Sequence, residues 1–179
     1  MLETENTALL VIDIQGKLAQ SMFNKEKLFQ NLQIIIKASQ ILKLPIIWTE
    51  QLPRKIGHTI PELAELLNGT NSIEKSSFSC CGNDKFLTAL SNIQCDNLLL
   101  VGIETHICVY QTAIDLLKRG YKVHAIADAI SSREAENRRI GLKKIEAAGG
   151  SLTTVETVLF ELLKTAENKN FSDIVKLIK

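Results

Sequence analysis

The sequence predicts an α/β fold in which a six-stranded parallel sheet lies between two layers of helices, a Rossmann-like three-layer α/β/α sandwich. Short apolar runs alternate along the chain with longer segments of helical periodicity. Strands that are apolar throughout, rather than at every second position, are typical of parallel sheets covered on both faces. The chain has 179 residues and is 45% hydrophobic. It is therefore expected to form a single domain over residues 1–179 with a sizeable core.

The first half of the chain is predicted to contain three strands. These are Ala8–Ile12, Pro45–Thr49 and Ser72–Lys75. The apolar spacing between the first two predicts a helix over Lys25–Leu42 with Asn24 as its N-cap. Pro53 and Gly57 make residues 51–59 a loop. A short helix over Pro61–Leu67 follows, because proline is favoured at the first helical position.

The second half continues the alternation. Its predicted elements are, in order, a helix capped by Asn83 and ending at Leu90, a strand over Asn97–Val101, a helix that contains Cys108 and ends at Lys118–Gly120, a strand over Lys122–Ala127, a helix capped by Ser131 or Ser132 and ending at Ala148, a strand over Leu152–Val155, and helices from Thr157 to the end. Gly149 and Gly150 supply the stop after the long helix.

Composition sets limits on the partners. The net charge is +1, from 21 basic and 20 acidic residues, and no long basic run occurs, so no nucleic-acid partner is expected. The N-terminus lacks a signal-peptide core, and no apolar stretch approaches ~20 residues, so we expect no membrane association. Four cysteines without a secretory signal indicate reduced thiols and a cytoplasmic protein, and the lack of a C-x-x-C pair argues against zinc and thioredoxin motifs.

Chemically capable side chains follow several of the predicted strands. Because carboxyl-end loops of parallel strands converge at one edge of the sheet, Asp13, Glu50, Lys75, Cys108 and Asp128 are expected near one another. Cys108 falls in the first turn of a helix, where backbone N–H groups stabilise a thiolate. The cysteine is therefore a candidate nucleophile.

Each of these residues also has a simpler interpretation. Asp13 could be a metal ligand, a phosphoacceptor or a cap, Lys75 a solvated surface residue, and Cys108 an inert core thiol. Together, however, they supply a base, an electropositive neighbour and a nucleophile from three strand ends. If Thr105 is the N-cap of the cysteine helix, its hydroxyl accepts from the N–H of Cys108. Neighbouring N–H groups would then be available to an oxyanion.

Four segments, in this order, carry a family resemblance. They are Ala8–Gln15, Glu74–Ser79, Gly102–Val109 and Ala127–Arg133. With them the chain resembles the isochorismatase-like cysteine hydrolase superfamily, which includes nicotinamidases and N-carbamoylsarcosine amidase, and it is most similar to the small isochorismatase-domain-containing subgroup. The resemblance covers nearly the whole chain and implies the isochorismatase-like hydrolase fold.

The resemblance assigns roles to individual residues. It implies that Cys108 is the nucleophile, Asp13 the catalytic acid/base and Lys75 the third member of the triad. It also implies a non-proline cis peptide between Ile103 and Glu104, with the N–H groups of Glu104 and Cys108 forming the oxyanion hole. Gln15, Trp48, Phe78, Thr105 and His106 are candidate substrate-binding residues near these positions. A homo-oligomer is a further implication.

Two departures from the family narrow the chemistry. Nicotinamidases carry an Asp-x-His metal motif after the second strand, whereas this chain has Trp48–Pro53 there and no such pair, so no metal and no other cofactor is expected. Isochorismatase itself has no cysteine at the nucleophile position, so Cys108 favours amide chemistry over vinyl-ether hydrolysis. The leading hypothesis is a hydrolase that cleaves a small amide or carbamoyl compound through a thioester.

Two other functions remain as alternatives. A catalytically silent binding or scaffold protein could use an apolar C-terminal helix pair, including Leu159, Leu163 and Ile174, for oligomer packing. A phosphoacceptor receiver domain could use Asp13 and Lys75, but receivers place the acceptor on the third strand and an acidic cluster on the first, and this chain does neither.

Overall fold

The computed structural model describes residues 1–179 and contains one six-stranded sheet in which all neighbouring strands are parallel. The strand order is β3-β2-β1-β4-β5-β6. The strands are β1 (Thr7–Ile12), β2 (Ile46–Gln51), β3 (Ile73–Lys75), β4 (Asn97–Ile103), β5 (Lys122–Ser131) and β6 (Ser151–Thr153). The predicted fold class is confirmed. Central strands β1 and β4 are buried at every position, as expected for strands covered on both faces.

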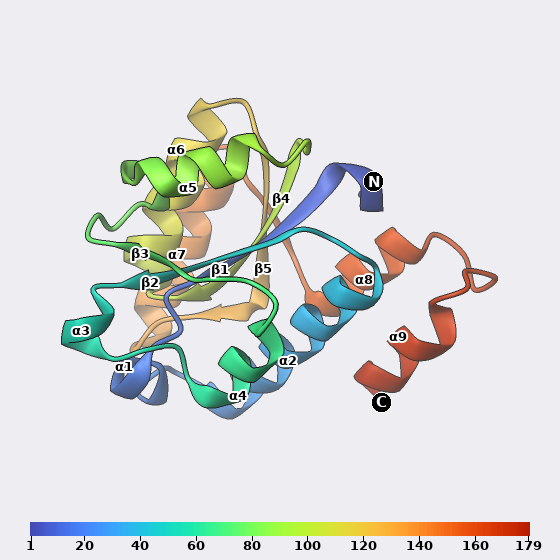
Figure 1. Ribbon diagram of the computed structural model, residues 1–179, viewed down its shortest axis with the longest axis horizontal. Helices are drawn as coiled ribbons and strands as arrows, with labels where there is room; N and C mark the ends of the chain where they lie inside the picture. Colours follow the sequence, from blue (N-terminus) through green and yellow to red (C-terminus); the bar gives the residue numbers. More distant parts are fainter.

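Helices cover both faces of the sheet (Figure 1). One layer contains α2 (Lys25–Ile41), α4 (Pro61–Ala64), α8 (Val155–Leu163) and α9 (Phe171–Ile178), and the other contains α5 (Asp84–Ser91), α6 (Tyr110–Lys118) and α7 (Ala135–Ala147). Alternate residues of β1 enter the two cores: Leu9 packs with the α2 layer and Leu10 with the α6 layer.

Short helical segments connect these elements. They are η1 (Thr4–Asn6), α1 (Gly16–Gln20), α3 (Pro53–Ile56), η2 (Glu65–Leu67), η3 (Cys80–Gly82) and η4 (Thr105–Val109), of which η4 is a single π-helical turn that leads into α6. α3 lies inside the segment predicted as a loop. It is only four residues long and begins at Pro53, so it leaves little periodic signal in the sequence.

The order of the strands fixes where a site can form. From β1 the chain moves outward through β2 to β3, then returns to place β4 on the other side of β1. β1 and β4 pair from Thr7 with Asn97 to Ile12 with Gly102. The connections that leave the carboxyl ends of these two strands therefore diverge, and such a switch point opens a crevice at that edge.

The predicted start of the long helix after β5 is wrong. Strand β5 continues to Ser131, which pairs with Ile103 of β4, and α7 begins only at Ala135. Neither Ser131 nor Ser132 caps that helix. The Ser131 hydroxyl instead donates to the carbonyl of Phe23 at 2.7 Å, a tertiary contact that the sequence pattern does not reveal.

The two other predicted caps have different outcomes. Asn83 caps α5 as expected, since its side chain accepts a hydrogen bond from Phe86 N. Asn24 occupies the N-cap position of α2 but adopts a left-handed conformation at φ 52° and makes no side-chain capping bond. The structure therefore confirms where α2 begins but not the predicted capping hydrogen bond.

The C-terminal helices pack against the rest of the chain. Leu159, Leu163 and Ile174, which suggested an oligomer surface, are at most 1% exposed and belong to the core on the α2 side of the sheet. No helix combines the length and the apolar character needed to cross a membrane.

At Gly102 the backbone of β4 lies close to that of β1. Its φ is 147°, and a Cβ there would lie 2.3 Å from the carbonyl oxygen of Ile12. We expect Gly102→Ala to lower the free energy of unfolding by at least about 2 kcal/mol, because backbone must move and the conformation is strained. Urea denaturation measures this, with Gly69→Ala as control because nothing lies within 4 Å of a Cβ at Gly69. Equal effects of the two substitutions would contradict this interpretation.

Candidate active site

Asp13 and Lys75 form a buried ion pair at the carboxyl edge of the sheet. Asp13 follows β1 directly and adopts a left-handed backbone conformation at φ 55°. Lys75 is the last residue of β3, two strands away, and its Nζ lies 2.6 Å from Asp13 Oδ2. Both side chains are at most 4% exposed. The long side chain of Lys75 thus reaches past β2, the strand that lies between β3 and β1.

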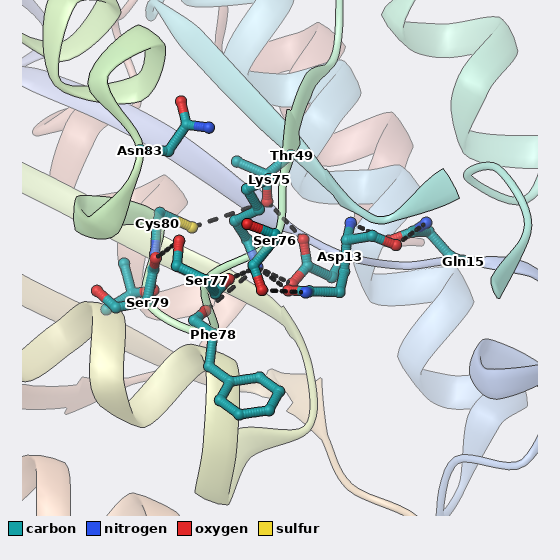
Figure 2. A network of polar contacts seen from close by, with 12 residues as sticks. Asp13, Gln15, Thr49, Lys75, Ser76, Ser77, Phe78, Ser79, Cys80 and Asn83 are labelled. Atoms are coloured by element: carbon teal, nitrogen blue, oxygen red, sulfur yellow. Dashed lines mark hydrogen bonds and ion pairs between the residues drawn. The ribbon is translucent and has the colours of Figure 1, made fainter. Parts of the chain in front are cut away.

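Other acceptors complete the surroundings of the Lys75 ammonium group (Figure 2). Its Nζ donates to Gln51 Oε1 at 2.7 Å and to the carbonyls of Ser77 and Phe78 at 3.1 and 3.2 Å. With Asp13, these make four oxygen acceptors around one fully buried cation. A buried charge needs such compensation, and the contacts fix the position of the ammonium group.

Thr49 orients the Asp13 carboxylate from the opposite side. Its hydroxyl donates to Asp13 Oδ1 at 2.7 Å, while Lys75 holds Oδ2. The Thr49 oxygen also lies 3.8 Å from Cys80 Sγ (Figure 2). Sequence reasoning missed Thr49 and Gln51 as site residues. Their only signal was their place at the end of β2, between the strands that carry Asp13 and Lys75.

Cys108 lies in the π-helical turn η4 that follows β4, and it lines the same cavity as Asp13. π-Helical turns occur frequently at functional sites. Burial raises the pKa of the Cys108 thiol to about 12, and the Asp13 carboxylate, as a charge and as a hydrogen-bond acceptor, adds to the increase while Lys75 opposes it. In the free protein, burial therefore favours the protonated thiol over the thiolate that a helix start would stabilise.

The cavity has a volume of about 190 Å³ and is mainly apolar. Asp13, Cys108, Gln51, Glu104 and Arg133 contribute polar groups to its lining. The apolar part of the lining comes from Leu18, Ile56, Phe78, Ile103 and Ile107. A concave apolar space with a few convergent polar groups is the usual form of a small-molecule site.

Glu104 is the single residue between β4 and η4. All peptide bonds are trans, so the cis peptide expected between Ile103 and Glu104 is absent. Glu104 instead adopts a left-handed conformation at φ 56° and ψ 58°, and with Gly102 at φ 147° it redirects the chain from strand to helix. Positive φ angles provide the sharp change of direction without a cis bond.

The Glu104 side chain is buried in a polar cluster that sequence reasoning did not predict. Arg133 Nε lies 3.1 Å from Glu104 Oε1, and Arg133 Nη2 lies 3.5 Å from Oε2. His106 Nε2 lies 3.6 Å from the same carboxylate, and His106 Nδ1 lies 3.0 Å from the Ser132 hydroxyl. His106 therefore contacts Glu104 and Ser132 and is absent from the cavity lining.

The remaining candidate substrate residues differ in their placement. Phe78 lines the cavity and is 56% exposed. Gln15 is buried, and its amide is hydrogen-bonded to the backbone of Gln51 and Gly57. Trp48 packs in the core on the α2 side of the sheet, whereas Cys108 belongs to the core on the other face. Of these three, only Phe78 lies where a ligand in the cavity would touch it.

Thr105 is not an N-cap. It is the first residue of η4 itself, and Glu104 occupies the capping position without a side-chain hydrogen bond. The Thr105 hydroxyl is buried and has no hydrogen-bond partner. Its backbone packs against α7, where a Cβ on Gly141 would lie 2.8 Å from the Thr105 carbonyl carbon. The threonine therefore contributes to packing rather than to the cavity lining.

Two of the five strand-end residues serve other parts of the fold. Glu50 Oε1 accepts from Thr59 N at 2.6 Å and from the Thr59 hydroxyl at 2.9 Å, which fastens the segment after β2. Asp128 lies within β5, and its Oδ1 accepts from Val155 N at the start of α8. Neither lines the cavity. No group of three or more His, Cys, Asp or Glu side chains is placed to hold a metal ion.

Comparison with known proteins identifies relatives of this chain. The isochorismatase domain family matches residues 7–157. The zebrafish (Danio rerio) isochorismatase domain-containing protein 2 is 36% identical over 177 residues, covering 99% of this chain and 89% of the relative. The resemblance found in the sequence is thereby confirmed.

Solved structures agree with the sequence comparison. The structure of the MAR1 ribonuclease from Caenorhabditis elegans superposes with a TM-score of 0.92 at 38% identity, covering 99% of this chain and 91% of that one. YcaC from Escherichia coli, described as an octameric hydrolase of unknown specificity, superposes with a TM-score of 0.94 at 22% identity, covering 99% and 88%. At that identity, the second likeness shows the fold alone.

The ion pair makes a prediction about stability. Lys75→Met leaves the Asp13 carboxylate buried without its counterion, so we expect a loss of about 3–5 kcal/mol in the free energy of unfolding at pH 7. Lys176→Met is the matched control, because the Lys176–Asp173 pair is exposed and should change stability by less than about 1 kcal/mol. Urea denaturation measures both, and similar small losses would show that the buried pair does not stabilise the fold.

The state of Cys108 makes a second prediction. With a pKa of about 12, the thiol is protonated at neutral pH, and the thiolate fraction rises about tenfold per pH unit below that value. Alkylation of Cys108 by iodoacetamide, followed by peptide mass spectrometry, should therefore accelerate from pH 7 to 10 without a plateau. Asp13→Asn removes a group that raises the pKa and should speed alkylation at pH 8. A plateau below pH 9 in the unmodified protein would refute this assignment.

Proposed function

Because the chain belongs to the isochorismatase family, we propose that it is a cysteine hydrolase that cleaves a small amide or carbamoyl compound with Cys108, Asp13 and Lys75. Membership of the family supports a hydrolase. The single observation that carries the finer proposal is that Cys108 and Asp13, which is paired with Lys75, line one cavity. A nucleophile and a base held in place by a cation are thus within reach of one bound molecule.

In the first half of the reaction, Cys108 sulfur attacks the carbonyl carbon of the amide as its proton passes to the Asp13 carboxylate. Negative charge develops on the carbonyl oxygen, and the backbone N–H groups of Glu104 and Cys108 stabilise it. The tetrahedral intermediate collapses, and the C–N bond breaks. The departing nitrogen takes the proton from Asp13, so that an amine or ammonia leaves and a Cys108 thioester remains.

In the second half, water replaces the amine. Asp13, again a carboxylate, accepts a proton from the water as its oxygen attacks the thioester carbonyl. The C–S bond then breaks, the sulfur regains a proton from Asp13, and the carboxylic acid leaves. Lys75 keeps one charge throughout and holds the Asp13 oxygen atoms in place, together with Thr49.

A thiol that is protonated at rest fits this scheme. Burial raises its pKa to about 12, so the thiolate forms only as the substrate is attacked and Asp13 takes the proton. The proposal includes a reducing, cytoplasmic setting, since the reaction needs a free Cys108 thiol and all four cysteines are unpaired. It also includes a homo-oligomer, by analogy with the octameric YcaC.

Two other functions have less support. A catalytically silent scaffold would be favoured by a nucleophile sealed away from any cavity, yet Cys108 lines one. The Caenorhabditis elegans relative is called a ribonuclease. For this chain, however, the apolar cavity of about 190 Å³ and the balanced net charge of +1 do not suit a polyanion.

The proposal predicts a Cys108 thioester. The protein is incubated with primary aliphatic amides and hydroxylamine, and hydroxamate and Cys108 acylation are followed by mass spectrometry. Cys108→Ala should abolish both signals, and Asp13→Asn should reduce turnover by roughly 100-fold or more. Cys95→Ala is the control, because Cys95 does not line the cavity and its substitution should retain turnover. Hydrolysis that survives in Cys108→Ala, or RNA cleavage that depends on Cys108, would overturn the proposal.

A further inference from the structure

We propose that the cavity selects an uncharged, apolar acyl group and rejects one that bears a carboxylate. This inference rests on the proposed function, because it names the substrate class of the same site. It is drawn from the charged residues that line the cavity and from the pairing of Arg133 with Glu104. No feature of it depends on the identity of the leaving amine.

Three charged residues line the cavity. They are Asp13, Glu104 and Arg133, which carry two carboxylates and one guanidinium. The other nearby cation, Lys75, has a fully buried side chain that is enclosed by protein oxygen atoms and does not line the cavity. A substrate carboxylate would therefore find Lys75 already compensated by Asp13 and only Arg133 accessible as a cation, and a charge that loses its water without gaining a partner is disfavoured.

That one cation is already paired. Arg133 contacts both oxygens of Glu104, at 3.1 Å through Nε and 3.5 Å through Nη2. The Glu104 side chain is 7% exposed, whereas that of Arg133 is 54% exposed. A substrate carboxylate that drew Arg133 away would leave a buried carboxylate without its counterion, which strongly disfavours that complex.

His106 does not replace the lost partner. Its Nε2 is 3.6 Å from Glu104 Oε2, longer than a hydrogen bond, and its Nδ1 is engaged with Ser132. The pair of Glu104 and Arg133 thus remains the arrangement in which both charges are compensated. A neutral substrate leaves this arrangement undisturbed.

The rest of the lining suits an aliphatic chain. Leu18, Ile56, Phe78, Ile103 and Ile107 present only apolar side chains. The volume of about 190 Å³ is below the range of about 300–1,000 Å³ typical of sites for drug-sized ligands. Burying a branched aliphatic acyl group against these side chains is favourable, whereas burying a charge there is not.

Two amides of matched shape test the proposal. 4-Methylpentanamide and succinamate differ mainly in that the isopropyl group of the first is replaced by a carboxylate in the second. Their binding to the Cys108→Ala variant is measured by calorimetry, which requires no turnover. We expect 4-methylpentanamide to bind at least about tenfold more tightly. Equal or tighter binding of succinamate, or no binding of either amide, would overturn the inference.

Charge variants in the Cys108→Ala background then show which residues cause the preference for the neutral amide. Glu104→Gln removes one carboxylate and releases Arg133, so it should reduce the preference for the neutral amide by roughly tenfold. Arg133→Gln should increase the preference, and the double variant should bring it back toward the starting value. Arg133 is half-exposed, so its substitution tests the pair even where Glu104→Gln fails to fold. A preference that none of these variants changes would overturn the role of the pair.

The outcome is separable from that of the proposed function. If the neutral amide binds preferentially but the unmodified protein forms no Cys108 thioester, the hydrolase proposal fails and the selectivity stands. If Cys108 is acylated by both amides with equal efficiency, the hydrolase proposal stands and the selectivity fails.

Discussion

The buried ion pair between Asp13 and Lys75 is the interaction on which the site depends. The two residues lie at the ends of strands separated by β2, and their side chains meet at 2.6 Å with almost no exposure. A pair of this kind is stable only when both charges find further partners. Gln51 and two carbonyls surround the ammonium group, and Thr49 holds the second oxygen of the carboxylate. The packing of β1, β2 and β3 therefore also fixes the position of the Asp13 carboxylate.

The position of the site follows from the order of the strands. β1 and β4 are neighbours, and the chain leaves them toward different sides of the sheet, so their carboxyl ends frame a crevice. Left-handed residues at both ends, Asp13 at φ 55° and Glu104 at φ 56°, turn the chain sharply out of the sheet. Such conformations are unfavourable for residues other than glycine and persist where the surrounding contacts compensate. Here an ion pair holds each of the two side chains.

The two ion pairs have different consequences for chemistry. The Asp13–Lys75 pair is buried and fixes the position of a carboxylate, while Glu104 and Arg133 line the cavity and the cation of their pair is half-exposed. Cys108 lies in the same enclosed region, where burial favours its protonated thiol. Low polarity of this kind also strengthens the electrostatic interactions that are made within it.

The sequence by itself determined the fold class and which strand-end residues lie at the candidate site. Apolar strands alternating with helical segments were sufficient for the parallel sheet, and residues at strand ends were sufficient to bring Asp13, Lys75 and Cys108 together, because parallel strands end at one edge. Only the tertiary structure decided the rest. The protonation of Cys108, the trans bond before Glu104, the roles of Thr49 and Arg133, and the exclusion of Trp48 from the cavity depend on burial, backbone dihedrals and contacts between distant segments. These quantities are properties of packing, and no local pattern of residues carries them.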